Sequence, residues 1–313
     1  MITSIFSKSK PINFIIVFFV MLLAFLVARL ELTKESITML FIGKQLVLLF
    51  TCYLSILLLN FIVSKNSLTN QNNYEILLFS LFLLLIPSTT INANILFSNF
   101  FVLLSLRRIM SLRSQRSEKQ KLFDAAFWIA LASLFYFWAI LFFALIPIAL
   151  ALYTDNNIRH WIIPFIGVAT VFVISVAISL FFYDSFFDIL NISPELSYDF
   201  NSYDTTRFIV AITLLLSFGV WSSVFYLQNI KKQKKAYRAS FKIIILAAVF
   251  AFFIVFQAPN KNGSEFLFLF APLAIIITNY VETIKEKWFK EIFLSAVAMV
   301  PIVLLVLQFF TKG

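Results

Sequence analysis

Residues 123–152 read FDAAFWIALASLFYFWAILFFALIPIALAL, a thirty-residue apolar stretch whose only charged residue is Asp124. Since a membrane-spanning helix needs about twenty apolar residues, the stretch fits either one long tilted helix or two short ones. The later loops decide between them, because Lys and Arg concentrate in loops on the cytoplasmic side. One helix would place the basic segment Asn229–Lys242 outside and the acidic segment Asp184–Arg207 inside. A pair of helices that turns near Phe135–Trp138 reverses both placements, so the charges favour the pair.

The rest of the chain carries nine further apolar runs: Ile12–Ala28, Leu46–Val63, Ile76–Pro87, Ile95–Leu106, Ile162–Tyr183, Phe208–Leu227, Ile243–Gln257, Phe266–Val281 and Ile292–Phe310. The third and fourth runs are short, and the polar link Ser88–Asn94 joins them. Polar backbone at that depth must pack inside the bundle or line a wet cavity. Two short helical pairs of this kind indicate either a pocket that opens outward or merely a thin part of the bundle.

These patterns predict the fold class and the topology. We expect an all-α polytopic transmembrane helical bundle of about 11 spans, including two short helical pairs, in a single integral membrane domain over residues 1–313. The first apolar run is expected to be an uncleaved span. The N-terminus is then cytoplasmic and the C-terminus extracytoplasmic, and most of the 25 Lys and Arg residues lie inside.

Composition supports a membrane protein and excludes several kinds of site. The chain is 61% hydrophobic and 13% charged, whereas about a quarter of the residues of soluble domains are charged. The net charge of +10 gathers in short loops, so it indicates membrane topology and the lipid bilayer as partner rather than nucleic acid. One cysteine and one histidine exclude an internal disulfide and any metal site built from several histidines, and we predict no metal site.

One acidic and aromatic segment on the expected outer side is a candidate for ligand binding. The acidic extracytoplasmic loop 184–207 interleaves carboxylates with aromatic rings, which could bind a sugar or hold a divalent cation. Its candidate substrate-binding residues are Asp184, Asp188, Asp204 and Arg207. The alternative is a solvated loop that charge sorting keeps outside. In the last outer loop, Ala258–Glu265, Lys261 and Glu265 could face a substrate phosphate or water, and we expect water.

The basic cytoplasmic loop 107–121 carries the clearest candidate for lipid contact on the inner side. Its basic residues extend the fourth predicted span, and clusters of this kind attract anionic headgroups. Arg107, Arg108 and Arg113 are the candidate lipid-headgroup residues. Charge sorting alone would also select such a segment. The predicted spans themselves carry almost no ionisable residue, which disfavours a proton-coupled transporter.

The order of these segments resembles the polytopic glycosyltransferases of the GT-C type. The resemblance covers roughly residues 1–183 and includes a first span followed by an acidic residue, Glu31, then short paired helices and a basic inner loop. It continues through the apolar stretch Phe127–Trp138. It ends in a run that contains Arg159, Trp161, Pro164 and Gly167. The opening FSKSKPINF, Phe6–Phe14, is also similar to an uncharacterised family of bacterial inner-membrane proteins.

The first resemblance implies an envelope enzyme that transfers or polymerises sugar from a polyprenyl phosphate carrier on the outer face. Glu31 would then be the catalytic base or metal contact, and Arg29 or Arg207 would face the lipid phosphate. The chain departs from that pattern, because the expected residue is usually Asp in an acidic pair, and a large outer domain is missing. A non-enzymatic subunit or scaffold of an envelope complex is the second hypothesis, and a lipid or small-molecule transporter is the third. The cofactor and any protein partners are left unknown.

Overall fold

The computed structural model describes residues 2–30, 38–153, 158–187 and 194–311. Within these ranges the chain forms α-helices and short 3-10 helices and no strands. The α-helices are α1 (Ile2–Phe6), α2 (Pro11–Arg29), α3 (Met39–Asn66), α4 (Tyr74–Leu85), α5 (Ala93–Ser111), α6 (Glu118–Phe135), α7 (Leu145–Tyr153), α8 (Ile158–Tyr183), α9 (Thr206–Lys232), α10 (Lys235–Gln257), α11 (Leu267–Thr283) and α12 (Lys287–Thr311). The 3-10 helices are η1 (Pro87–Thr90), η2 (Leu112–Ser114), η3 (Phe137–Ala144), η4 (Asn201–Tyr203) and η5 (Ser264–Phe266).

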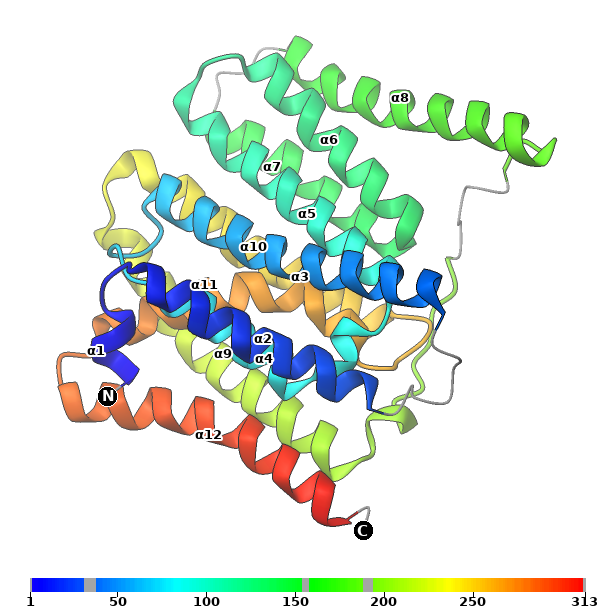
Figure 1. Cartoon of the computed structure of the whole chain (residues 1–313). Coiled ribbons are helices and arrows are strands. Elements are labelled where there is room, and N and C mark those ends of the chain that lie inside the picture. Colours follow the sequence, from blue (N-terminus) through cyan, green and yellow to red (C-terminus); the bar gives the residue numbers. More distant parts are fainter. Residues whose placement is uncertain (1, 31–37, 154–157, 188–193, 312–313) are drawn as a thin grey trace.

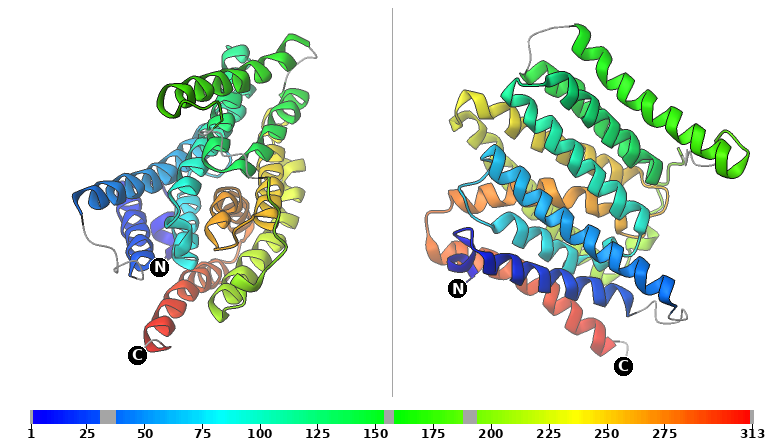
Figure 2. Two further views of the ribbon diagram at one scale, coloured as in Figure 1. Left: turned by 90° about the vertical axis from the view of Figure 1, so that its right-hand side faces the viewer. Right: turned by 45° about the horizontal axis from the view of Figure 1, so that its top comes forward.

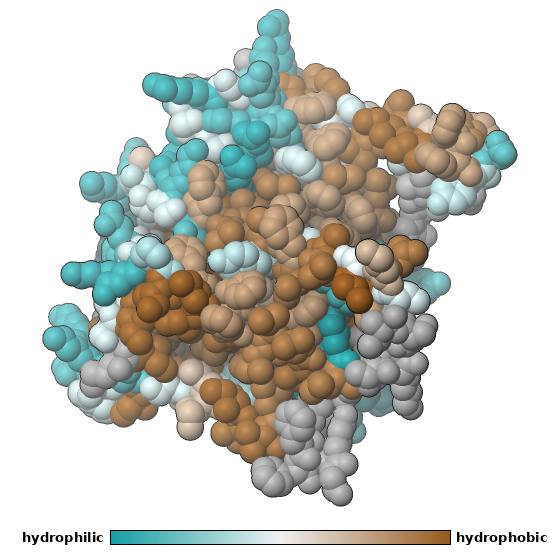
Figure 3. Space-filling view, in the orientation of Figure 1, coloured by the Kyte–Doolittle hydropathy of each residue, from teal (hydrophilic) through white to brown (hydrophobic). Residues whose placement is uncertain are grey.

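The helices are those of a membrane protein. Eight helices of the described part of the chain are long and apolar enough to cross a membrane, and Tyr74–Leu85 and Phe137–Tyr153 are shorter apolar helices. Hydrophobic residues cover the middle of the face shown in Figure 3, while hydrophilic residues gather at its ends. The all-α membrane class predicted from the sequence is therefore confirmed. The count of eleven spans stays a prediction, because helix length and composition support eight.

The long helices run side by side, so most connections between them fall at two ends of the bundle (Figures 1 and 2). At one end, here called the basic end, α3, α5 and α9 finish with Lys65, Arg108 and Lys232 in their last turns. Cations in a last turn offset the negative end of the helix dipole. At the opposite end, here called the η1 end, Arg29 at the end of α2 contacts Thr90 of η1.

Helices α4 and α11 form the centre of the bundle. All residues of α4 are buried, and so are residues 267–281 of α11. Both helices are apolar on nearly every side, and other helices rather than lipid cover them here. Phe270 of α11 lies between Phe79 and Phe82 of α4, with ring centroids 6.2 and 5.6 Å away. Bulky aromatic packing therefore fills the core.

The break inside the decisive apolar stretch lies where the charges predicted it. Helix α6 ends at Phe135, Tyr136 is extended with φ −147° and ψ 107°, and η3 begins at Phe137. Segments η3 and α7 then run back toward the start of α6. Gln115 Nε2, just before α6, donates to the carbonyl oxygen of Tyr153, at the end of α7, at 3.3 Å. The predicted turn near Phe135–Trp138 is confirmed.

The other short pair, α4 with α5, is joined by a compact polar link. Thr89 and Thr90 of η1 are fully buried, and their hydroxyls donate to the carbonyl oxygens of Ile86 and Pro87. Asn92 then caps α5, since its Oδ1 accepts hydrogen bonds from the N–H groups of Asn94 and Ile95. The polar side chains thus satisfy the backbone of the link, as a buried position requires.

Helix α8 lies at the edge of the bundle (Figure 2). It packs on α6, and Gly167 makes the close approach possible. A Cβ at Gly167 would lie 2.8 Å from the carbonyl oxygen of Phe123 and 3.0 Å from the Cβ of Ala126. Further along, Phe181 and Phe182 are exposed. Helix α8 therefore presents an apolar surface to the lipid or to another protein.

Candidate functional site

A cavity of about 590 Å³ lies at the η1 end, between the last turn of α2 and the first turn of α9. Its polar wall consists of Ser88 from η1 and Thr205, Thr206 and Arg207 at the start of α9. Its apolar wall comes from α2, the end of α4 and η1, α9 and α12: Val27, Ala28, Leu85, Ile86, Pro87, Ile91, Phe208, Leu304 and Leu307. A molecule bound here would meet a polar group at one side and hydrocarbon at the other.

The start of α9 supplies positive potential to this cavity. Thr205 is the N-cap residue, extended at φ −104° and ψ 140°, and its hydroxyl oxygen accepts a hydrogen bond from the N–H of Phe208 at 3.4 Å. The first turn of a helix has N–H groups without intrahelical partners, so it favours an anion. Arg207 adds a full positive charge one residue into the helix. Phosphate and carboxylate groups fit such a position.

Ser88 and Gly263 shape the back of the cavity. The hydroxyl oxygen of Ser88 is buried and has no hydrogen-bond partner among the residues that the structure describes. Gly263 has a φ of +88°, and a Cβ there would lie 2.5 Å from Cε1 of Phe208 and 2.7 Å from Oγ of Ser88. Only glycine adopts this backbone conformation without strain. The position therefore brings the 258–263 segment into direct contact with η1 and α9.

Behind this contact lies a fully buried carboxylate. Glu265 of η5 is 0% exposed, and its Oε1 accepts hydrogen bonds from the N–H of Gly263 at 3.1 Å and from the hydroxyl of Tyr203. Its Oε2 lacks a partner within the described ranges. The expectation that Glu265 faces water is wrong, because Tyr203 and Gly263 supply the donors that a buried carboxylate needs.

Lys261 is likewise buried rather than hydrated. It is 4% exposed, and its ammonium group donates to the carbonyl oxygens of Phe256 at 2.8 Å and Ala258 at 3.1 Å. The ammonium group also lies 4.6 Å from the ring centroid of Phe200, a favourable cation–π geometry. Burial lowers the pKa of Lys261, and the charge of Asp199 opposes that shift. The expectation of a water-facing lysine is also wrong.

Arg29, a predicted substrate-binding residue, is fixed by protein groups. Its Nη1 donates to the carbonyl oxygen of Phe25 at 3.0 Å and to Oγ1 of Thr90 at 3.2 Å, and its Nη2 donates to the carbonyl oxygen of Thr90 at 2.8 Å. Its Nε donates to Oε1 of Gln45 in α3. Arg29 thus ties together α2, α3 and η1, and its role in substrate binding stays a prediction.

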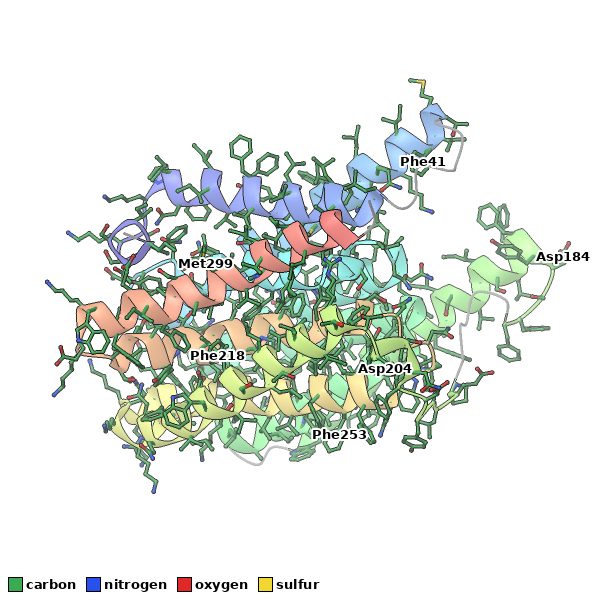
Figure 4. The ribbon with its side chains drawn as sticks, turned by 90° about the horizontal axis from the view of Figure 1, so that it is seen from below. Phe41, Asp184, Asp204, Phe218, Phe253 and Met299 are labelled. Atoms are coloured by element: carbon green, nitrogen blue, oxygen red, sulfur yellow. The ribbon has the colours of Figure 1, made fainter. Side chains whose placement is uncertain are left out.

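The other predicted outer residues lie in different places. Asp204 is exposed three residues before Arg207. Asp184 is exposed at the far end of α8, with a φ of 51°, and Figure 4 shows it well away from Asp204. The structure therefore does not bring Asp184 to the Arg207 cavity. Glu31 and Asp188 lie outside the described residues. Their roles stay predictions.

The predicted basic loop 107–121 is mostly helical. Helix α5 continues to Ser111, η2 covers Leu112–Ser114, and α6 begins at Glu118. The fourth span is therefore extended as expected, but only to Ser111, because the chain breaks at Gln115 and Ser117, which have φ of 50° and 51°, before α6 begins. Arg107, Arg108 and Arg113 line a second cavity, of about 290 Å³, at the basic end. The structure thus brings the three predicted lipid-headgroup residues together.

One position was missed by the sequence analysis. Glu75, which precedes the predicted span Ile76–Pro87, lies in the first turn of α4 and is 0% exposed. Neither of its carboxylate oxygens has a hydrogen-bond partner in the described part of the chain. Uniform apolarity gave no signal, because a span that faces lipid is as apolar as one that is buried inside the bundle.

Comparison with known proteins gives one match. Over residues 1–312 the chain matches a family of unknown function, DUF6427. No curated protein and no solved structure matches it. The resemblance to polytopic glycosyltransferases gains no support from these comparisons.

Proposed function

Because the chain belongs to this family of unknown function, we propose an activity from the cavity at the η1 end. The protein is a bacterial inner-membrane enzyme that takes a polyprenyl-phosphate-linked sugar at the outer face and transfers or polymerises the sugar. The observation that carries the proposal is a single cavity that joins Arg207 and the first turn of α9 to an apolar wall from α2 and α12.

The proposal includes the eleven-span topology, with the basic end in the cytoplasm. Two contacts support it for the short helix α4. The N–H of Asn73, at its start, donates to the carbonyl oxygen of Phe6 at 3.0 Å. At the other end Thr90 of η1 accepts from Arg29, so α4 and η1 together run alongside the whole of α2. The positive-inside rule then places the basic end in the cytoplasm and the cavity outside.

The cavity suits a lipid phosphate. Arg and helix N-terminal N–H groups both bind phosphate oxygens, and Arg does so with paired hydrogen bonds. Val27 and Ala28 of α2, with Leu304 and Leu307 of α12, would contact the prenyl chain. Helices α2 and α12 both pack on α4, so the cavity is positioned between two helices at the lipid boundary.

In the transfer step an acceptor hydroxyl attacks the anomeric carbon of the sugar, and the bond to the phosphate oxygen breaks. A base removes the hydroxyl proton, and the polyprenyl phosphate leaves with an additional negative charge. Arg207 would stabilise that charge. Glu31 is the proposed base. It follows Arg29 by two residues, and Arg29 is fixed beside η1.

The alternative, a non-enzymatic subunit of an envelope complex, is favoured by α8. This helix packs on α6 and α7, and it exposes Phe165, Phe172 and Phe181 among other large apolar side chains. Under this alternative the exposed side of α8 binds a partner protein. Substitutions on α8 would then abolish function, and substitutions at the cavity would have no effect.

The test is a mass-spectrometric profile of lipid-linked sugars and envelope glycans in a deletion strain. The strain is complemented with wild type, Glu31→Gln, Arg207→Gln or, as the matched control, Lys231→Gln, which removes an exposed positive charge at the other end of α9. We expect a glycan defect in the deletion strain, Glu31→Gln and Arg207→Gln at equal protein level, and a normal profile for Lys231→Gln. A normal profile in the deletion strain would refute the enzyme proposal.

A further inference from the structure

The cavity at the basic end concentrates positive charge. It is lined by the last turns of α3 and α5, by η2 and by the first turn of α6, and five of its ten lining residues are Lys or Arg: Lys65, Arg107, Arg108, Arg113 and Lys121. No acidic residue lines it within the part of the chain that the structure describes. The proposed sugar transfer at the opposite end makes no use of this cavity.

Three of the five cations are held by protein groups. Arg108 forms an ion pair of 3.0 Å with Asp124. Arg113 lies 4.2 Å from the ring centroid of Tyr237 and donates weakly, at 3.4 Å, to the carbonyl oxygen of Asn66. The ammonium group of Lys121 donates to the carbonyl oxygen of Ser111 at 2.7 Å and to Oγ of Ser114 at 2.6 Å. These contacts fix the walls of the cavity.

The other two cations, Arg107 and Lys65, make no hydrogen bond or ion pair with any residue that the structure describes. Both instead lie over the ring of Phe61, at 4.9 Å for Arg107 and 5.2 Å for Lys65. Both side chains line the same cavity, and their N–H groups stay available. Two cations with free donors in one cavity can bind a phosphate group.

The crowding of like charges supports the same conclusion. The pKa of Lys121 is lowered by burial and further by Arg108, Lys65 and Arg116, while Glu118 opposes the shift. Helix C-termini account for part of this charge, since cations favour the negative end of a helix dipole. The dipoles of α3 and α5 account for cations at two helix ends, whereas five cations line this one cavity. An external anion would relieve the repulsion among them.

We propose that this cavity binds the phosphate group of an anionic lipid of the adjacent leaflet. The lipid is favoured over a soluble phosphate because Phe61, a large apolar side chain that is 39% exposed on α3, also lines the cavity. A headgroup phosphate can lie between Arg107 and Lys65 while the acyl chains continue past Phe61 along the lipid-facing side of α3. Basic clusters next to a membrane bind anionic headgroups in this way.

The test is native mass spectrometry of the full-length protein, titrated in detergent with phosphatidylglycerol or phosphatidylcholine. The pocket variant carries Lys65→Gln and Arg107→Gln. The matched control carries Lys231→Gln and Lys232→Gln, which remove the same charge from exposed positions at the end of α9. Glycerol 3-phosphate serves as the soluble source of phosphate. Size-exclusion profiles and melting temperatures show whether both variants fold. If the pocket variant does not fold, Arg107→Lys, which keeps the charge, is used as a second variant.

We expect the pocket variant to bind phosphatidylglycerol roughly 30-fold more weakly than wild type, since each basic residue near an anionic surface contributes a factor of about five. The control and Arg107→Lys should bind within about twofold to threefold of wild type. Equal losses in both double variants would overturn the proposal, because net charge alone would then explain binding. Displacement of the lipid by glycerol 3-phosphate at equal concentration, or equal binding of phosphatidylcholine, would overturn the assignment to an anionic lipid.

Discussion

Replacing Gly263 by alanine tests how the back of the η1-end cavity is built. The residue has a φ of +88°, and its missing Cβ would overlap Phe208 and Ser88 at 2.5 and 2.7 Å. An L-residue in the left-handed region costs about 1–2 kcal/mol. Overpacking a filled site costs about 1–3 kcal/mol more. Together these effects predict that Gly263→Ala lowers the free energy of unfolding by about 3 kcal/mol.

The assay is thermal unfolding of the purified protein in detergent. Ligand binding at the η1-end cavity is measured separately. With an unfolding entropy near 2 cal/mol/K per residue, about 3 kcal/mol corresponds to a fall in Tm of about 5 °C. The displaced Phe208 ring and Ser88 hydroxyl should also narrow the cavity. Binding of a short-chain polyprenyl phosphate should therefore weaken in Gly263→Ala, even at temperatures well below its Tm.

The matched control is Gly43→Ala. Gly43 lies inside α3, and a Cβ there would have nothing within 4 Å. Alanine in a helix interior is more stable than glycine by about 0.5–1 kcal/mol, so Tm should rise by about 1 °C. An unchanged Tm for Gly263→Ala, or the same shift in both variants, would refute the described contact between the 258–263 segment, η1 and α9.

Three further predictions concern the scaffold. Gly167→Ala should push α8 away from α6, because the new Cβ would lie 2.8 Å from the carbonyl oxygen of Phe123. Proteolysis of α8 in detergent should then be faster than in wild type, and an unchanged cleavage rate would contradict the prediction. Arg29→Gln removes hydrogen bonds from a charged group to α3 and η1, so the free energy of unfolding should fall by about 2 kcal/mol and Tm by about 3 °C. An unchanged Tm would exclude the role of Arg29 in tying α2 to α3 and η1. Reporter tags after Lys235 should be cytoplasmic and tags near Ser197 extracytoplasmic, and the reverse at either site would refute the eleven-span topology.

The sequence predicted what depends on local composition and charge. The turn at Tyr136 followed from loop charges alone, because a one-helix alternative violated the positive-inside rule at two loops. The polar link Ser88–Asn94 was predicted to pack inside the bundle or line a cavity, and its threonines are buried while Ser88 lines the cavity. Neither inference requires knowledge of which helices meet.

The sequence could not predict contacts between distant segments. Tyr203 and Glu265 are 62 positions apart, and their hydrogen bond is what turns an expected surface carboxylate into a buried one. The pairing of Arg107 with Lys65 likewise depends on Phe61 and on the packing of α3 against α5. In each case the sequence pattern indicates that a residue lies near the end of a helix. It does not indicate which residue of another helix lies next to it.

The two central helices explain why polar groups are buried at the η1 end of the bundle core. Neighbouring helices surround α4 along its whole length and α11 over residues 267–281. The polar groups that start or end these helices are therefore inside protein and must find partners there. Thr90 of η1 and Glu265 of η5 are buried for this reason. Arg29 donates a hydrogen bond to Thr90, and Tyr203 donates one to Glu265. Asp184 at the far end of α8 has no such constraint, so it is exposed and lies away from the cavity.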